Sequence, residues 1–380
     1  MAGNNGNRLL DPLPHGVILQ AKRHVPAVSR LHRQTLTMER LRRLDVLVPT
    51  HNRAGRLDGC LKSVLNAKPC AGLEVHVTVI CNACTDGSQE LVRRLQAAYP
   101  RRMSLLEERR RGKSRALNLG IASTSGDLVG MIDDDEEVDA TWIEVIGAAF
   151  EDPALDFAGG PYVAVWPTPP PDWLPDDYLA VLGSVDNGSV PREYDHAFPG
   201  ILKGGNAVIR RRTLERVGPF AEHLGPGSFS RLFSCEDEDM YLRLLEAGAK
   251  GKYLPRLVIY HYIDEQRLTR EYYRSWCFWR GVSRGMMDRR HPMPVPYLAG
   301  VPRFLWGSAA RGFWRLAASF RQRPSKDSFE DELRMWDVAG FFYGRHIYAL
   351  ARFSPVRSRR QEDRNKPNSH SKHDKVELAG

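Results

Sequence analysis

Several features that would define other classes of protein are missing from this sequence of 380 residues. It contains no run of about 18 uncharged apolar residues, so we expect no transmembrane helix. Residues 1–20 lack the continuous apolar segment that a secretory signal requires. No internal repeat is evident, and no Gly-X-Gly-X-X-Gly follows the first predicted strand, which argues against a dinucleotide-dependent oxidoreductase.

Cysteine is also scarce, with six residues in the whole chain. Six are too few for a disulfide scaffold in a chain of this length, so we expect free thiols and a cytoplasmic protein. Cys81 and Cys84 have the Cys-X-X-Cys spacing of redox and zinc sites. Because no second pair lies nearby, we interpret them as two packed thiols at the end of a strand.

Hydrophobic residues make up 42% of the chain and charged residues 27%, as in ordinary globular proteins. The net charge of +9 is unevenly distributed: residues 1–43 carry +6, residues 44–260 carry −7 and residues 261–380 carry +10. An acidic centre argues against a nucleic-acid partner. It fits a metal or catalytic centre, with basic ends that could face phosphates or anionic lipid.

Apolar strands alternate with helical patterns along the centre of the chain. We predict strands at 44–49, 73–80, 103–107, 127–132, 158–165, 200–210 and 252–260, and helices at 56–67, 86–99, 113–122, 140–150, 235–247, 268–289, 297–320 and 330–352. This alternation is typical of βαβ units, so we predict an α/β protein with a mostly parallel central sheet. Ligands of such sheets bind at the carboxyl ends of the strands.

The same patterns divide the chain into four parts. We predict a weakly ordered basic leader at 1–43, a main domain at 44–290, a helical extension at 291–353 and a disordered basic tail at 354–380. In the extension, 301–320 mixes Trp, Phe and Leu with three arginines. This pattern favours an amphipathic helix on the cytoplasmic face of an anionic membrane. Packing on the main domain and a dimer contact are the alternatives.

A block of carboxylates, Asp133 to Glu137, directly follows a predicted strand. Ionised groups cannot be buried there without partners. Two carboxylates two residues apart at a strand end can share a hard cation, and Mg²⁺ or Mn²⁺ commonly binds one or two carboxylates together with substrate phosphates. The alternative is a solvated acidic N-terminus for the helix predicted at 140–150.

A second acidic block, Glu236 to Asp239, opens the helix predicted at 235–247. The free N–H groups of a helix start stabilise ionised carboxylates, and an ionised carboxylate is what a general base needs. A simple helix N-terminal cluster would explain one or two acids better than four.

Polar residues follow two other strands. Pro49, Thr50, His51, Asn52 and Arg53 stand at the end of the first strand, where a nucleotide would meet backbone amides. Lys113 and Arg115 begin the helix after the third strand, where a cation near a diphosphate is plausible. We interpret the run 109–111 as a solvated loop.

Five blocks stand in order along the chain: VLVPTHNRAGRLDGCLKSVL, VICNACTDGSQELV, GKSRALNLGIASTSGDLVGMIDDDEEV, GGNAVIRRRTLERVGPFAEHLG and SCEDEDMYLRLLEAG. Together they resemble the family 2 glycosyltransferases, inverting enzymes with the Rossmann-like GT-A fold, over about 44–285. The resemblance implies a nucleotide-binding part at 44–137 and an acceptor and catalytic part at 138–290.

The resemblance also implies roles for particular residues. Asp237 matches the general base, and Glu236 and Asp239 would orient it. Asp135 matches the direct metal ligand and Asp133 the first acid of Asp-X-Asp, with His261 as a third ligand or diphosphate contact. The donor would contact Pro49, Thr50, Asn52, Arg53, Asn82, Asp86, Lys113, Arg115, Asp133, Asp134, Gly205 and Asn206.

The implied donor is a nucleoside diphosphate sugar with Mn²⁺ or Mg²⁺, and the implied acceptor is a glycan or lipid-linked hydroxyl of the cell envelope. Many family members have Asp at the position of Cys81, where a carboxylate contacts the base. A thiol cannot replace that contact, so base recognition would fall to Asn82, Asp86 or backbone groups. We still expect a UDP-sugar ahead of GDP- or dTDP-sugars.

Two other classes of function remain as alternatives. A two-metal nuclease or nucleotidyltransferase would use Asp133, Asp135, Asp237 and Asp239 as its metal cage. A catalytically dead sugar-nucleotide-binding protein would keep the fold without turnover. The acidic central domain argues against the first alternative, and the two intact acidic blocks argue against the second.

Overall fold

The computed structural model describes residues 43–228, 230, 232–318 and 326–348. The predicted tail and, apart from Arg43, the predicted leader lie outside these residues. The strands are β1 (Arg43–Thr50), β2 (Glu74–Asn82), β3 (Met103–Glu108), β4 (Leu128–Met131), β5 (Glu136–Val138), β6 (Phe157–Gly159), β7 (Tyr162–Val165), β8 (Arg192–Tyr194), β9 (Ala207–Arg210), β10 (Gly251–Tyr253), β11 (Ile259–Tyr262), β12 (Tyr297–Leu298) and β13 (Val301–Pro302).

The α-helices are α1 (Ala54–Asn66), α2 (Ser88–Ala98), α3 (Lys113–Ser123), α4 (Trp142–Ala149), α5 (Arg211–Val217), α6 (Glu236–Glu246), α7 (Arg270–Met287), α8 (Arg303–Ala318) and α9 (Lys326–Phe342). Short 3₁₀ turns are η1 (Asp176–Leu182), η2 (Gly204–Asn206) and η3 (Glu265–Arg267), and a π turn, η4 (Tyr343–Tyr348), follows α9.

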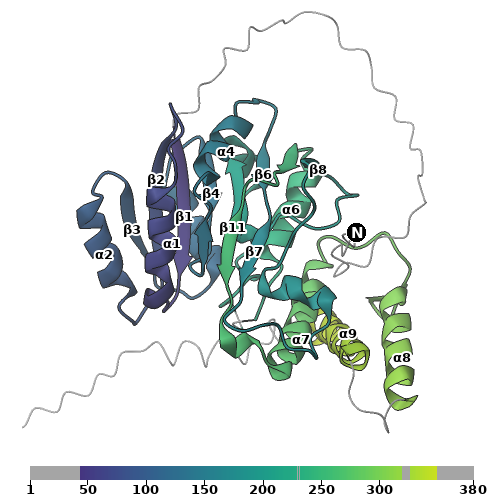
Figure 1. Ribbon diagram of the computed structural model, residues 1–380. Coiled ribbons are helices and arrows are strands. Elements are labelled where there is room, and N and C mark those ends of the chain that lie inside the picture. The colour runs from purple at the N-terminus through teal and green to yellow at the C-terminus, as the bar shows by residue number, and fades with distance from the viewer. Residues whose placement is uncertain (1–42, 229, 231, 319–325, 349–380) are drawn as a thin grey trace, which may run out of the picture.

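The main sheet has eight strands in the order β3-β2-β1-β4-β9-β6-β10-β8 (Figure 1). Strands β3, β2, β1 and β4 are parallel, and β9 is antiparallel to both of its neighbours. The predicted α/β class with a mostly parallel central sheet is therefore confirmed. The carboxyl ends of β1, β2 and β4 meet at one edge of the sheet.

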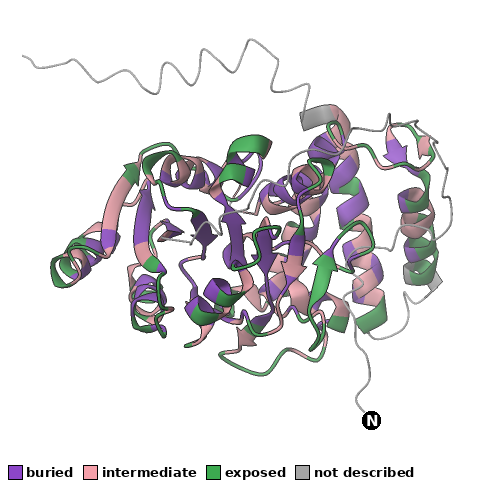
Figure 2. Cartoon of the chain, turned by 90° about the horizontal axis from the view of Figure 1, so that it is seen from above, coloured by how far each residue is buried: buried purple, intermediate pink, exposed green. Residues whose placement is uncertain are grey.

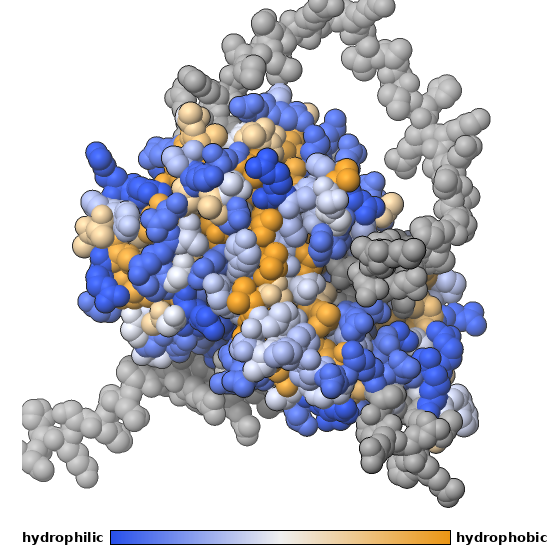
Figure 3. Space-filling model, viewed as in Figure 1, coloured by the Kyte–Doolittle hydropathy of each residue, from blue (hydrophilic) through white to orange (hydrophobic). Residues whose placement is uncertain are grey.

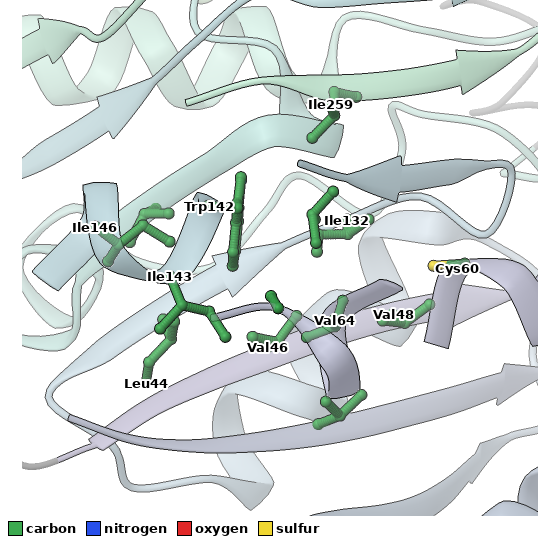
Figure 4. Packing of buried hydrophobic residues seen from close by; sticks show 14 of the residues in the cluster. Leu44, Val46, Val48, Cys60, Val64, Ile132, Trp142, Ile143, Ile146 and Ile259 are labelled. Atoms are coloured by element: carbon green, nitrogen blue, oxygen red, sulfur yellow. The ribbon is translucent and has the colours of Figure 1, made fainter. Parts of the chain in front are cut away.

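Alternating apolar residues in β1 build a core on each face of the sheet. Leu44, Val46 and Val48 pack with α1, α2 and α4, whereas Leu47 packs on the opposite face with α3, α5 and α6. Figure 4 shows the first face, with Trp142, Ile143 and Ile146 of α4 beside Leu44 and Val46 of β1. Figure 2 shows buried strands at the centre and exposed outer helix faces.

Two predicted strands are each divided between two sheets. The prediction 158–165 becomes β6 and β7, and 252–260 becomes β10 and β11; β6 and β10 join the main sheet, whereas β7 and β11 form a three-stranded sheet with β5. Each break contains a proline, Pro161 or Pro255, which cannot donate a ladder hydrogen bond. His261 is therefore inside β11, opposite Glu136 of β5, and not beyond a strand.

The C-terminal helices pack on one another beside the sheet. Gly281 of α7 and Gly340 of α9 let the two backbones approach so closely that a Cβ at either position would collide with the other helix. The helix predicted at 297–320 begins only at Arg303, because 297–302 forms the β12–β13 hairpin. The predicted boundary at residue 290 stays a prediction.

Candidate active site

The first acidic block continues β4 past the carboxyl edge of the main sheet. Asp134 is buried there, and its Oδ2 accepts hydrogen bonds from Thr50 Oγ1 at 2.7 Å and from the His51 backbone N–H at 3.4 Å. Burial and the neighbouring Asp135 raise the pKa of Asp134 to about 7, against the lowering effect of Arg53. The β1 loop and the acidic block therefore form one hydrogen-bonded unit.

Asp135 sits among three cationic or potentially cationic groups. Its Oδ2 lies 2.8 Å from Arg53 Nη1 and 3.1 Å from Arg267 Nη2. His261 Nε2 lies 3.7 Å from the same oxygen. Burial alone would raise the pKa of Asp135, but these three neighbours hold it well below its ordinary value. Asp135 is therefore a carboxylate, the form that a metal or cation requires.

Arg267 is a site residue that the sequence analysis missed. It ends η3, six residues after His261, and its guanidinium reaches back across the small sheet to the acidic block. The one signal in the sequence for Arg267 was its position a few residues beyond His261. That signal was weak, because the sequence did not place β11 beside β5.

The side chains around Asp135 offer few protein ligands for a metal ion. Among the residues that the structure describes, no group of three or more His, Cys, Asp or Glu side chains could hold a metal ion. Asp135 and His261 form a pair, and His261 Nδ1 is 2.8 Å from the Leu182 carbonyl, which leaves Nε2 directed at Asp135. Two protein ligands fit Mg²⁺ or Mn²⁺ when phosphate oxygens and water complete the shell.

Lys113 links the first acidic block to the second. Its Nζ lies 2.5 Å from Asp133 Oδ1 and 3.7 Å from Glu236 Oε1. Burial would lower the pKa of Lys113, but Asp133 and Glu236 raise it above the usual value, so the ammonium is retained. Burial and Asp237 raise the pKa of Glu236 to about 7, against Lys113. The structure thus directs Asp133 toward Lys113, whereas the sequence analysis expected it on the metal.

Asp237 stands in the first turn of α6, next to an unusual backbone conformation. Cys235, directly before the helix, has a φ of 72°, which is uncommon for a residue with a side chain. The Gly204 N–H lies 3.4 Å from Asp237 Oδ2. Asp237 lines a cleft with Ala180, Val181, Val185, Pro199, Gly200, Ile201, Lys203, Ser234, Cys235, Glu238, Trp276 and Arg280.

Asp239 is not directed toward Asp237. Its Oδ2 is 2.9 Å from Arg243 Nη2, and its Oδ1 is 3.4 Å from His291 Nε2. Since the side chain is fully buried in this cluster, we expect it to stabilise α6, and the orienting role predicted for it stays a prediction. The same placement removes Asp239 from the four-carboxylate cage of the two-metal alternative.

Two other residues that were expected to contact the donor make close contacts within the fold. Gly205 lies so close to the Glu136 carboxylate that a Cβ there would collide with it. Asn206 is buried; its Oδ1 accepts from Trp142 Nε1 at 3.0 Å, and its Nδ2 donates to the Leu257 carbonyl at 2.7 Å. Gly205 therefore packs on the acidic block and Asn206 joins α4 to the segment before β11, while the donor contacts expected for them stay predictions.

The loops after β1 and β2 are tied together by side chains that were expected to bind the donor. Asn52, at a φ of 55°, accepts from the Thr85 N–H at 2.7 Å, and Asp86 accepts from the Ala54 N–H at 3.1 Å. Asn82 accepts from the Gly112 N–H and donates to two backbone carbonyls. Both N–H groups of its amide are thus used within the fold, and its role in reading the base stays a prediction.

Arg115 and Pro49 complete the expected set. Arg115 is directed away from the acids and pairs with Glu222 at 3.1 Å, so the structure does not bring it to the site. Pro49 lies buried in β1, in register with Ile80 of β2. Thr50, Arg53, Lys113, Asp133, Asp134, Asp135, Glu236, Asp237 and His261 are the predicted residues that the structure gathers at the carboxyl edge.

This arrangement is that of the GT-A fold: a mostly parallel α/β sheet with an acidic block at the end of β4 and a second acidic block at the start of α6. The profile of Glycosyl transferase family 2 matches residues 45–218. The sequence resemblance to the family 2 glycosyltransferases is therefore confirmed over these residues.

Known relatives agree with this assignment. Glycosyltransferase AglE of Haloferax volcanii is 25% identical over 184 residues, which span 48% of this chain and 58% of AglE. The pre-mycofactocin glycosyltransferase of Mycobacterium tuberculosis is 25% identical over 344 residues, 84% of this chain and 68% of that protein. The chain thus spans less than two thirds of the length of AglE.

A solved structure shares the fold. The mannosyltransferase PcManGT from Pyrobaculum calidifontis, in complex with GDP-Man and Mn²⁺, superposes with a TM-score of 0.53 over 80% of this chain and 87% of its own, at 19% sequence identity. At this identity the likeness concerns the fold alone.

Proposed function

We propose that the protein transfers a sugar from a nucleoside diphosphate sugar to a hydroxyl acceptor, with inversion at the anomeric carbon. The observation that carries the proposal is the bridge at Lys113, which joins Asp133 of the first acidic block to Glu236 of the second. This bridge brings a cation-binding corner and a candidate general base to one edge of the sheet. A glycosyltransferase needs both at one site.

The donor diphosphate would lie against Arg53, Arg267 and Lys113, whose cations suit phosphate oxygens. Asp135 and His261 would hold Mn²⁺ or Mg²⁺; when bound, the ion would neutralise charge on the leaving diphosphate. The mannosyltransferase neighbour was solved with GDP-Man and Mn²⁺, which supports a metal-dependent donor. The sequence favours UDP, whereas the mannosyltransferase neighbour was solved with GDP-Man. Competition between UDP- and GDP-sugars for the protein would identify the base.

Asp237 would take the proton from the acceptor hydroxyl. The acceptor oxygen then forms a bond to the anomeric carbon as the bond to the diphosphate oxygen breaks and its electron pair leaves with the diphosphate. Attack from the face opposite the leaving group inverts the centre in one displacement. Asp237 stands in the first turn of α6, and its Oδ1 accepts a hydrogen bond from the Glu238 N–H at 2.9 Å.

The cleft beside Asp237 would receive the acceptor. Its walls combine the aromatic ring of Trp276 with apolar residues such as Val181 and Ile201, and Lys203 lies at the same surface. Aromatic faces suit sugar rings, and apolar walls suit the first carbons of a lipid. A relative named glucosyl-dolichyl phosphate glucuronosyltransferase supports a lipid-linked acceptor, alongside a glycan of the cell envelope.

The test is a donor panel with purified protein, Mn²⁺ or Mg²⁺, and UDP-, GDP- and dTDP-sugars, with release of the nucleoside diphosphate as the readout. Asp237→Asn should lower turnover about 100-fold or more, the range for a general base, and keep donor affinity. Asp135→Ala should abolish the Mn²⁺-dependent part of donor binding, measured by calorimetry.

Glu246→Gln is the matched control, because Glu246 lies at the far end of α6 and is exposed. It should leave turnover and donor affinity unchanged. Wild-type turnover in Asp237→Asn would contradict the assignment of Asp237 as the general base. Equal donor affinity with and without Mn²⁺ would contradict a role of the metal in donor binding.

A further inference from the structure

Exposed apolar side chains gather at one place in the part of the chain that the structure describes. Leu298 of the β12–β13 hairpin is 58% exposed, and Phe313 and Trp314 of α8 are 57% and 70% exposed. Phe304, in the first turn of α8, is 38% exposed. The other exposed large apolar residues, Val163, Val190 and Trp336, belong to three different elements or loops. Apolar exposure this concentrated marks an interaction surface.

The same segment is basic. Residues 297–318 contain Arg303, Arg311 and Arg315 and no acidic residue. Within the described residues, Arg315 pairs with Asp331 of α9, whereas the guanidinium groups of Arg303 and Arg311 have no acidic partner. Both of these arginines are exposed. Two free positive charges therefore accompany the exposed aromatic rings.

At about 100° per residue, helical spacing places Arg303, Phe304, Arg311 and Trp314 on the side of α8 that faces away from the protein, whereas Phe313 lies on a flank. The inner side, with Leu305 and Gly312, packs on α9. Figure 1 shows α8 at the outer edge of the molecule, with α9 between it and α7. Figure 2 shows exposed residues along α8, and Figure 3 shows strongly hydrophilic residues at the same corner. We call this side, with Leu298, the α8 face.

We infer that the α8 face binds the surface of an anionic lipid bilayer. Aromatic rings beside arginines on one helix side are the pattern of an interfacial helix, which buries the rings among lipid headgroups and places the guanidinium groups on lipid phosphates. No helix of the described residues is long and apolar enough to cross a membrane. The helix would therefore lie along the surface.

A second copy of the chain is a poorer occupant of this face. A two-fold dimer brings the same patch of both subunits together, so Arg303 and Arg311 would face their own copies without an acid from 297–318 between them. Like charges opposed across an interface oppose association. An anionic bilayer supplies the missing negative charge.

The test is sedimentation of the full-length protein with vesicles of equimolar phosphatidylglycerol and phosphatidylcholine, compared with phosphatidylcholine alone. We expect binding to the anionic vesicles, weaker at high salt. Arg303→Gln/Arg311→Gln should lower the affinity about 30-fold, because each arginine near an anionic surface contributes about fivefold. Phe304→Ser/Trp314→Ser should lower it at least tenfold, by removing the two rings that share a side of α8 with these arginines.

The matched controls are Arg94→Gln/Arg101→Gln, which removes two exposed arginines near the far edge of the sheet, and Val190→Ser, which removes an exposed apolar residue from a loop. Both should bind vesicles like the wild type. Thermal unfolding should be nearly unchanged in all variants, since the substituted side chains are exposed.

Undiminished vesicle binding in both α8 variants would overturn the proposal and assign the binding to the basic ends of the chain, 1–42 or 349–380. Absence of vesicle binding together with a dimer that these substitutions dissociate, measured by light scattering, would overturn it in favour of a second copy. The readout needs neither donor nor acceptor, so the result is independent of the proposed transferase activity.

Discussion

The Nζ atom of Lys113 lies 2.5 Å from Oδ1 of Asp133, with 15% of the lysine side chain exposed. Lys113→Met should therefore lower the free energy of unfolding by about 3 kcal/mol, because the buried carboxylate of Glu236 and that of Asp133 lose their shared cation. Urea denaturation measures the change. Arg115→Met, two residues along the same helix, breaks an exposed pair with Glu222 and should cost about 1 kcal/mol at most. Equal losses in the two variants would contradict the bridging role.

Asp239 and Asp237 should respond in opposite ways to the same substitution. Asp239→Asn breaks the ion pair between a fully buried carboxylate and the partly buried Arg243 and should lower the free energy of unfolding by about 3 kcal/mol, while the folded fraction keeps its donor affinity. Asp237→Asn should keep the stability and lose turnover. Combined denaturation and nucleotide-release assays measure both. Loss of turnover in fully folded Asp239→Asn would restore the role that the sequence suggested for Asp239.

Arg267 gives a prediction that the sequence alone did not suggest. Arg267→Gln should weaken donor binding about 10- to 100-fold, the loss of one charge-assisted hydrogen bond. Arg270→Gln is the control: its guanidinium lies over the rings of Trp173 and Phe329, and it should leave donor affinity unchanged. Calorimetry with donor and Mn²⁺ measures both. Tighter Mn²⁺ binding by Arg267→Gln, with unchanged donor affinity, would mean that Arg267 only balances the charge of Asp135.

The sequence predicted the parts of the site that follow directly from strand ends. Strands β1 and β4 have a simple apolar pattern. Their carboxyl ends, with Thr50 and Asp133 to Asp135, could therefore be placed at one edge of the main sheet from the sequence. The start of α6 was equally readable from its acids. These positions depend on local pattern and on the general topology of parallel sheets.

The contacts that the sequence did not predict join distant segments. Whether Asn82 reads a base or fastens the 108–112 loop depends on backbone groups about 30 residues away, and whether Asp239 faces the site depends on the rotation of α6 about its axis. Arg267 was missed because β11 joins β5 in a second sheet, which the alternating pattern did not reveal. Side-chain partners of this kind are set by tertiary packing and leave no local signal.

Cys84 offers a probe of the nucleotide loop through its pKa. Its thiol lies 3.3 Å from the Thr50 carbonyl, and its hydrogen bond with Cys81 lowers the pKa of Cys84 to about 7. The thiolate is the reactive form, so the rate of alkylation by iodoacetamide should rise through pH 7 and level off above about pH 8, whereas an ordinary thiol keeps accelerating. Mass spectrometry of labelled peptides follows Cys84 and, as the internal control, the partly exposed Cys70 in the segment between α1 and β2. Bound donor should slow labelling of Cys84 alone, because it covers the loop at Thr50. A Cys84 profile that matches Cys70, or one that donor leaves unchanged, would separate this thiol from the donor site.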